Sequence, residues 1–294
     1  NAAHPKRRSK IWMVKSKPQE RFVRVRDINL RYVDWGDNGP MLLLLHGSMR
    51  TSRSWDAMAR LLHDRFHVIA LDARGHGNSD WTQRGYGYSN LIEDLKGFCD
   101  ELNLKSMIAV GHSLGGEVLT LLAEQCPALF DFLVLLEPRV LIDRPEDRTE
   151  PQRPHRRRTW SSREDLHGFL KQHRTAGRWR DDVILDVVNH ETMELPDGRI
   201  DIKWSPDSMN HDESHREHAD LKPVFRALNM PILFVVSELR VSNFRDLPPL
   251  ASETPNFHLT TVKNTDHNMY MERPDAVASV ISDFVNDRAL SEFI

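Results

Sequence analysis

The sequence predicts an α/β fold in which a mainly parallel sheet is covered by helices. Hydrophobic residues make up 39% of the 294 residues, which is enough for a sizeable core. Short continuous apolar runs, such as Met41 to Leu45 and His67 to Leu71, are typical of strands buried on both faces. Helix-patterned segments alternate with these runs, and that alternation favours parallel strands joined by crossover helices.

The expected elements follow one another in a regular order. Residues 22–25 and 30–35 predict an antiparallel hairpin, because Asp27-Ile28-Asn29 supplies turn-forming residues between two alternating runs. Beyond the hairpin, strands are expected over 42–45, 67–71, 107–110, 132–136, 231–236 and 257–262. Helices are expected over 52–62, 89–102 and 117–125, with a final amphipathic helix that ends near residue 288.

The alternating pattern stops after Glu137-Pro138 and resumes at Pro231. The stretch between is rich in Arg, Asp, Glu and His and contains no long apolar strand run, so we interpret it as an insertion. The expected organisation is a basic N-terminal arm over 1–20, a core domain over 21–138, the insertion over 139–222, and the rest of the core over 223–294.

The most informative motif is Gly111-His112-Ser113-Leu114-Gly115, which stands between an apolar run and a helix-patterned run. Strand, G-x-S-x-G and helix in that order describe a nucleophile elbow, a sharp turn that presents a serine hydroxyl above the end of a sheet. The two glycines let backbones pass closely, and the serine itself sits in an unfavourable backbone region. The motif predicts that Ser113 is a nucleophile.

Two further turns extend this pattern. His46-Gly47-Ser48-Met49 follows the strand at 42–45, and Asp72-Ala73-Arg74-Gly75-His76-Gly77-Asn78-Ser79 follows the strand at 67–71. With the elbow, they make the chain resemble the α/β-hydrolase superfamily from about residue 22 to about residue 288. The resemblance implies an eight-stranded sheet with helices on both faces, and a helical cap inserted after the sixth strand. Such caps set substrate shape by closing a cleft over the active site.

The resemblance also places the catalytic base. In the superfamily the catalytic histidine lies in the loop between the last strand and the last helix, and only His267 fits that position. The common G-x-G-H approach is replaced here by Asn264-Thr265-Asp266, so the path of the loop is expected to differ from the usual one.

The acid of the triad is harder to place. Many relatives carry an Asp in a G-x-x-D turn after the strand at 231–236, but this chain has Ser237-Glu238-Leu239-Arg240 there, with Arg where that Asp would fall. A subset of the superfamily places the acid after the preceding strand, where this chain offers Glu137. We expect Glu137 to be the acid, with Glu238 as the alternative and Asp246 and Asp266 less favoured. This placement is similar to that of zearalenone-type lactonases.

These residues imply a serine hydrolase that acts on a small hydrophobic carboxylic ester or lactone without a cofactor. Ser113 would attack the acyl carbon, His267 would carry the proton, and Glu137 would orient the imidazole. Oxyanion donors are expected from the backbone N–H of Leu114 and that of Ser48 or Met49. Epoxide hydrolases and haloalkane dehalogenases share the fold but use an aspartate nucleophile. Hydrolysis of a carbon–carbon bond, perhydrolysis, or a non-catalytic receptor on the same fold remain as alternatives.

The cap is expected to supply an apolar roof for the substrate. Some of its apolar residues should line the pocket and the others pack the cap onto the core: Trp160, Phe169, Leu170, Trp179, Val183, Leu185, Val187, Val188 and Trp204. We assign substrate contacts to Trp160, Trp179, Trp204 and His112. The charged run Arg153-Pro154-His155-Arg156-Arg157-Arg158 is expected to be solvated surface, which favours a neutral substrate; if the run faced inward, an anionic substrate would be favoured instead.

Composition narrows the remaining classes. A net charge of −3 gives no reason to expect nucleic-acid binding, and no apolar segment is long enough to span a membrane. Cys99 and Cys126 form no disulfide framework, which favours reduced thiols and a cytoplasmic protein. His211, His215 and His218 lack the glutamate of an H-E-x-x-H site, so no metal is expected. The sequence leaves open whether the chain forms a homo-oligomer.

Overall fold

The computed structural model describes residues 18–36, 39–141, 157–209, 220–287, 290 and 294. Eight strands form one sheet in the order β1-β2-β4-β3-β5-β6-β9-β10. Their bounds are β1 Gln19–Val25, β2 Ile28–Asp34, β3 Met41–Leu45, β4 His67–Leu71, β5 Met107–His112, β6 Phe130–Leu136, β9 Ile232–Ser237 and β10 Phe257–Val262. The β1–β2 and β2–β4 pairs are antiparallel and every other neighbouring pair is parallel, which confirms the predicted fold class.

The first hairpin differs from its expected form. β1 begins at Gln19, inside the range expected for the N-terminal arm, and Glu20 accepts a hydrogen bond from Arg31 Nε of β2 at 2.8 Å. The turn lies at Arg26 and Asp27, and Arg26 has a φ of 53°. Ile28 belongs to β2 because its side chain is buried in the core. Burial of Ile28 therefore makes the turn begin at Arg26, one residue before the expected stretch Asp27-Ile28-Asn29.

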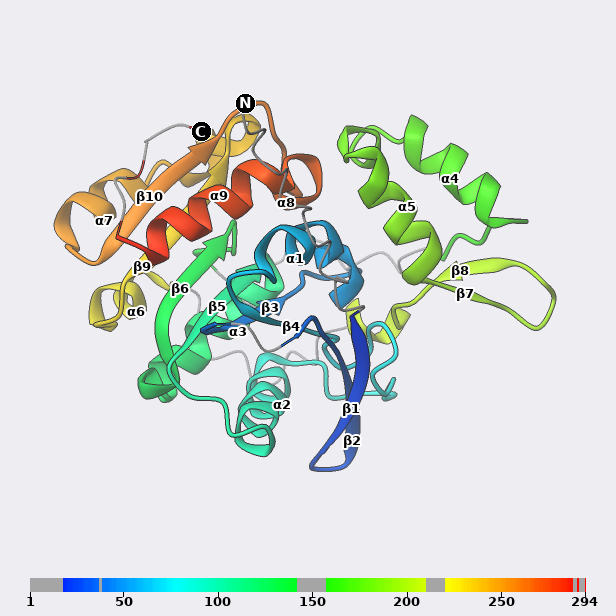
Figure 1. Cartoon of the computed structure of the whole chain (residues 1–294), viewed down its shortest axis with the longest axis horizontal. Helices are drawn as coiled ribbons and strands as arrows, with labels where there is room; N and C mark the ends of the chain where they lie inside the picture. Colours follow the sequence, from blue (N-terminus) through cyan, green and yellow to red (C-terminus); the bar gives the residue numbers. More distant parts are fainter. Residues whose placement is uncertain (1–17, 37–38, 142–156, 210–219, 288–289, 291–293) are drawn as a thin grey trace, which may run out of the picture.

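Helices cover both faces of the sheet (Figure 1). The core on one face involves α2 (Tyr88–Glu101), α3 (Leu114–Gln125), α6 (Lys222–Ala227) and α7 (Leu247–Glu253). The core on the other face involves α1 (Asp56–Leu62), α8 (Met269–Glu272) and α9 (Pro274–Val285). Within β3, Leu43 and Leu45 enter the first core, whereas Leu42 and Leu44 enter the second. The strand is continuously apolar because both of its faces are buried.

Between β6 and α6 the chain forms a separate group of elements, at the right of Figure 1. It contains α4 (Arg163–Gln172), α5 (Asp181–His190) and a hairpin of β7 (Thr192–Glu194) and β8 (Ile200–Ile202). The hairpin was not expected from the sequence. Its turn contains Asp197-Gly198, with Gly198 at a φ of 80°, and this dipeptide is a strong hairpin signal. We call residues 157–209 the cap.

Several contacts fasten the cap to the core. Arg60 of α1 forms an ion pair with Asp186 of α5 at 2.6 Å, and the Arg180 N–H donates to Met271 O at 3.0 Å. Gly77, in the loop after β4, donates its N–H to Lys203 O at 2.8 Å. The cap therefore packs against the core through both backbone and charged contacts.

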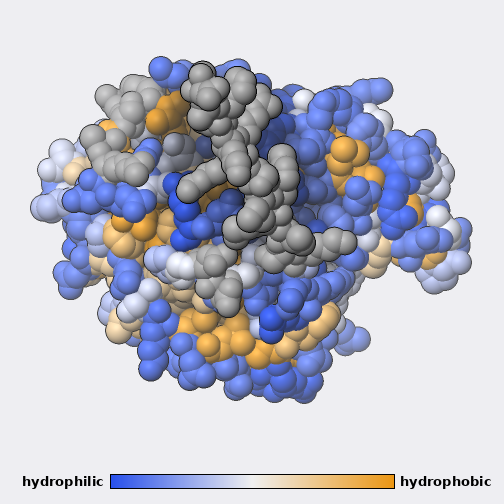
Figure 2. Space-filling model, viewed as in Figure 1, coloured by the Kyte–Doolittle hydropathy of each residue, from blue (hydrophilic) through white to orange (hydrophobic). Residues whose placement is uncertain are grey.

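The surface seen in Figure 2 is mostly hydrophilic, with smaller hydrophobic areas.

Some expectations fall on segments outside the described residues. These are most of the basic arm, residues 153–156 of the charged run, and His211, His215 and His218. Within the described ranges, no helix is both long and apolar enough to cross a membrane. Cys99 and Cys126 are free thiols, and burial raises the pKa of Cys99 to about 12.

Candidate active site

The ends of β5 and β6 bring Ser113 and Glu137 to the same edge of the sheet. The two strands are parallel neighbours with His112 opposite Leu136, and each candidate residue directly follows its strand. The Ser113 N–H donates to Leu136 O at 3.0 Å, which fixes the start of the turn against β6. Ser113 and Glu137 both have left-handed backbone angles, with φ of 50° and 47°. Strain of this kind is concentrated at functional sites.

The glycines of the elbow allow close backbone contacts. A Cβ atom on Gly115 would lie 2.4 Å from Leu45 O, and one on Gly111 would lie 2.6 Å from Gly116 N. Neither backbone atom could move away without shifting β3 or the first turn of α3. The spacing of the G-x-S-x-G motif therefore has a steric cause.

Glu137 contacts the His267 imidazole. His267 Nδ1 lies 2.8 Å from Glu137 Oε2, and because an ionised carboxylate only accepts, Nδ1 carries the proton and Nε2 is left as a base. The Glu137 side chain is 0% exposed. Its second oxygen accepts hydrogen bonds from the Ser237 N–H, at 2.7 Å, and from the Ser237 hydroxyl. Ser237 was not predicted as a site residue, although it is the last residue of β9, next to the alternative acid Glu238.

The other three candidate acids have different partners. Glu238 Oε2 accepts from the Asn264 N–H at 2.8 Å, Asp246 pairs with Lys222 at 3.3 Å, and Asp266 Oδ1 accepts from the backbone N–H of His267 at 2.8 Å. None of these contacts reaches the imidazole.

Arg240, at the position where the family resemblance implied an Asp, contacts Glu137 instead. Its Nε lies 3.4 Å from Glu137 Oε2, and its side chain is 38% exposed. A cation from the segment after β9 thus faces the carboxylate at the end of the neighbouring strand, β6.

His112 positions the loop that carries His267. Its Nε2–H donates to His267 O at 2.9 Å, and the two rings lie 4.5 Å apart. Burial, followed by the neighbouring His267, holds the pKa of His112 well below its ordinary value, so the ring is neutral. The loop is also held by the Asp266 N–H, which donates to Glu272 Oε1 at 3.1 Å. These contacts orient the loop where the glycines of the common G-x-G-H approach are missing.

The oxyanion donors can be narrowed from the backbone contacts. Leu114 is the first residue of α3, so its N–H has no partner within the helix. The Met49 N–H donates to His76 Nε2 at 3.2 Å. Ser48, in the turn after β3, lines the same cavity as Ser113. Its backbone N–H has no hydrogen-bond partner among the described residues. The geometry therefore favours Ser48 over Met49 as the second donor.

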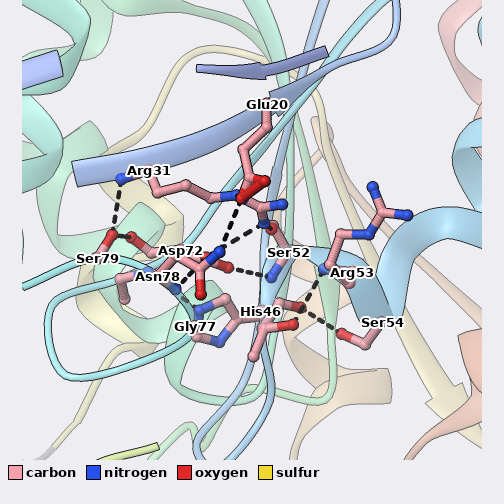
Figure 3. Close-up of polar contacts among 12 residues, drawn as sticks. Glu20, Arg31, His46, Ser52, Arg53, Ser54, Asp72, Gly77, Asn78 and Ser79 are labelled. Atoms are coloured by element: carbon pink, nitrogen blue, oxygen red, sulfur yellow. Dashed lines mark hydrogen bonds and ion pairs between the residues drawn. The ribbon is translucent and has the colours of Figure 1, made fainter. Parts of the chain in front are cut away.

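A buried polar network holds the turns after β3 and β4 (Figure 3). Asp72 accepts from the Ser52 N–H at 2.7 Å and the Asn78 N–H at 2.9 Å. His46 Nδ1–H donates to Gly47 O at 2.8 Å, and its Nε2 accepts from the Ala73 N–H at 3.0 Å. Burial lowers the pKa of His46 and keeps the ring neutral, as this bonding pattern requires. His46 and Asp72 therefore support the turn His46-Gly47-Ser48-Met49, which we call the oxyanion turn.

Ser113 and His267 open onto a cavity of about 580 Å³ between the cap and the core. All four residues that we assigned to the substrate line it: His112, Trp160, Trp179 and Trp204. Phe169 and Leu170 add to its apolar wall. The other apolar cap residues do not line the cavity, since Val183, Val187 and Val188 are buried in the core and Leu185 is exposed.

The charged run behaves only partly as expected. Arg157 and Arg158 are the two residues of the run that the structure describes, and both line the cavity. Arg50, which directly follows the oxyanion turn, also lines it. The long side chains lie against aromatic rings, which offset part of the desolvation of a guanidinium. Arg158 is exposed, as expected for this run, but both arginines also line the cavity, which was not expected.

A second cavity of about 450 Å³ meets the same two catalytic candidates. Ser113 and His267 line it together with Arg240, Phe244 and Arg245, from the segment that follows β9. Nothing in the sequence pattern indicated this second cavity. Ser113 and His267 thus line both cavities.

One group of side chains has the spacing of metal ligands. Ligand atoms of Asp56, Asp186 and His190 lie within 4.8 Å of one another. Arg53 and Arg60 already pair with the two carboxylates, at 2.7 and 2.6 Å. The group is better described as a cluster of ion pairs at the boundary between α1 and the cap.

Comparisons with known proteins show the family to which the chain belongs. The chain is 28% identical over 285 residues to the uncharacterized hydrolase YugF of Bacillus subtilis, covering 91% of this chain and 98% of that protein. It is 25% identical over 259 residues to 2-(acetamidomethylene)succinate hydrolase of Mesorhizobium japonicum, covering 85% and 89%. The crystal structure of an E-2-(acetamidomethylene)succinate hydrolase superposes with a TM-score of 0.76 and 23% identity, over 92% of this chain and 100% of that one. The model of the alpha/beta hydrolase family matches residues 42–280, and the chain therefore belongs to the α/β-hydrolase family.

Proposed function

We propose that the chain is a serine hydrolase that cleaves a carboxylic ester or lactone through an acyl-enzyme. The observation that carries the proposal is the 2.8 Å contact between His267 Nδ1 and the buried Glu137, beside a serine in a strained elbow. Ser113 Oγ attacks the acyl carbon while His267 Nε2 takes its proton, and the same proton then passes to the leaving alcohol. Water, activated by His267, releases the acid and restores Ser113.

Glu137 has two roles in this mechanism. It holds the imidazole in the tautomer that leaves Nε2 free, and it stabilises the imidazolium that forms as the proton is transferred. The backbone N–H groups of Leu114 and Ser48 bind the oxyanion, and donors of this kind contribute ~3–4 kcal/mol each.

The two cavities suggest how a substrate lies. We place the acyl part in one cavity and the leaving group in the other, with the scissile carbonyl where Ser113 and His267 line both. In a lactone the two parts stay covalently joined after ring opening, so both cavities would be filled by one product. The position of Glu137, similar to that of the acid in zearalenone-type lactonases, supports the lactone among ester substrates.

Hydrolysis of an amide or of a carbon–carbon bond is the second candidate. It is favoured by the relative named 2-(acetamidomethylene)succinate hydrolase, which matches 85% of the chain. The same serine, histidine and oxyanion donors serve either bond, and the difference lies in the leaving group that His267 must protonate. Turnover of an ester and of an anilide that carry the same acyl group separates ester from amide hydrolysis, because an esterase hydrolyses only the ester at a useful rate.

Labelling with a fluorophosphonate tests the proposal. The wild-type protein should form a covalent adduct on the peptide that contains Ser113, and Ser113→Ala should form none. Absence of an adduct on the folded wild-type protein would favour the non-catalytic receptor over the enzyme. An adduct on another serine would contradict the assigned nucleophile.

A further inference from the structure

The larger cavity is electropositive in a chain whose net charge is −3. Its described lining carries three arginines, Arg50, Arg157 and Arg158, against one carboxylate, Asp201. From this we infer that Arg50 and Arg158 bind a free carboxylate of the substrate, so that the natural substrate is an ester, lactone or amide that also carries an acid group. The inference rests on the proposed function, and it replaces the neutral substrate that the sequence favoured.

Arg157 is not part of the proposed carboxylate site. Its Nε is hydrogen-bonded to Asp201, and its Nη1 donates to Trp204 O at 3.0 Å. Its guanidinium also lies 5.8 Å from the centroid of the Trp204 ring. These contacts neutralise the charge of Arg157 and fasten the start of the cap to the hairpin. The side chain is a structural element of the cavity wall.

Arg50 supplies the first charge of the proposed site. It directly follows the oxyanion turn, its guanidinium lies over Trp179 at 5.1 Å, and its side chain is 13% exposed. Its Nη1 is buried and has no hydrogen-bond partner among the described residues. Nη1 forms an ion pair with the wholly buried Glu191 carboxylate at 3.6 Å, a distance too long for a hydrogen bond. Arg50 also lines the cavity, so its charge acts on a carboxylate bound there as well as on Glu191.

Arg158 supplies the second charge. Its guanidinium lies 4.1 Å from the centroid of the Phe169 ring and 5.8 Å from that of Trp160. The residue is exposed, and no described acid forms an ion pair with it. Stacking on the aromatic wall leaves the edge of the guanidinium open for a bidentate contact with a carboxylate. Because it is more exposed than Arg50, its effect should be smaller and more sensitive to salt.

The aromatic wall remains part of the site. Trp160, Trp179 and Phe169 lie beside the same two arginines, so one surface can hold both an apolar body and its acid group. The substrate we infer is therefore amphipathic. It carries a ring or chain that packs on the aromatic side chains and a carboxylate that reaches the guanidinium groups.

The test compares two esters of one leaving group. We would measure kcat/KM for the neutral 4-nitrophenyl butyrate and for the carboxylate-bearing mono-4-nitrophenyl glutarate, at low and high ionic strength. The wild type should prefer the glutarate, and added salt should reduce the preference. Arg50→Gln should lower the glutarate-to-butyrate ratio by about 10- to 100-fold, as expected for a charge-assisted hydrogen bond, and Arg158→Gln by about threefold. Arg65→Gln, an exposed arginine outside the cavity, is the matched control and should leave the ratio unchanged.

A second measurement does not depend on the folding of any variant. 4-Phenylbutyrate should protect wild-type Ser113 from a fluorophosphonate at a concentration about tenfold lower than 4-phenylbutyramide, because only the acid can pair with the arginines. Equal protection by the two compounds, or an ester ratio that Arg50→Gln leaves unchanged, would overturn the carboxylate site. Either result could occur while Ser113 is still labelled, so failure of this inference is distinct from failure of the proposed hydrolase.

Discussion

Removal of the Glu137 carboxylate should inactivate the enzyme, whereas removal of the Glu238 carboxylate should not. Glu137 is wholly buried and accepts from His267 Nδ1 at 2.8 Å, so its loss leaves the imidazole free to rotate and to adopt the wrong tautomer. Loss of this function in a serine triad lowers kcat by ~10²–10⁴-fold, equivalent to ~3–5 kcal/mol in the activation barrier. Glu238 accepts instead from the Asn264 N–H, and Glu238→Ala should lower kcat less than about tenfold.

The assay is ester hydrolysis under saturating substrate for the wild type, Glu137→Ala and Glu238→Ala. Because Glu137→Ala leaves the buried Ser237 hydroxyl and the Arg240 guanidinium without their carboxylate, thermal unfolding must be followed in parallel. A folded Glu137→Ala protein that keeps more than a tenth of wild-type kcat would refute the assignment. So would a greater loss in Glu238→Ala, which would restore the commoner arrangement of the superfamily.

Three further predictions concern stability and support of the site. Burial raises the pKa of Glu191 from 4.5 to about 7, so the protonated side chain stabilises the fold at low pH and this stabilisation is lost as the pH rises through that window. Because Gln mimics the protonated form, the Tm of Glu191→Gln minus that of the wild type should be several degrees higher at pH 8 than at pH 5. An equal Tm difference at the two pH values would contradict this prediction. Gly115→Ala places a Cβ 2.4 Å from a backbone oxygen of β3 and should lower both Tm and kcat, whereas Gly168→Ala, with no atom within 4 Å, should leave kcat unchanged and keep or raise Tm. Ser237→Ala removes one hydrogen bond to Glu137 and should lower kcat about three- to tenfold at unchanged KM; an unchanged kcat would remove Ser237 from the account.

The sheet could be predicted closely because its strands leave little choice. A run such as Met41 to Leu45 is apolar at every position only when both faces are buried, and its expected and observed bounds differ by one residue. The first hairpin was less certain, because turn-forming residues cover more positions than the turn uses. Burial of the Ile28 side chain decides the register, and burial depends on the finished core.

The site could be predicted only in part. Ser113 and His267 follow from order along the chain, but Glu137 and Glu238 stayed open because the choice depends on which side chain points at the imidazole. The inward direction of Arg50 and Arg158 could not be predicted either, since long charged side chains usually stay in water. Arg50 packs against Trp179, which lies far from it in the sequence, whereas Arg158 packs against Trp160 and Phe169 of the cap and stays exposed.

The most direct test of the account is the activity of Ser113→Ala. The account predicts that kcat for the best ester falls by ~10⁴-fold or more, while binding of a product acid stays measurable, because the cavity and the oxyanion donors remain in place. A folded Ser113→Ala protein that retains more than about a tenth of the wild-type activity would contradict the acyl-enzyme mechanism itself.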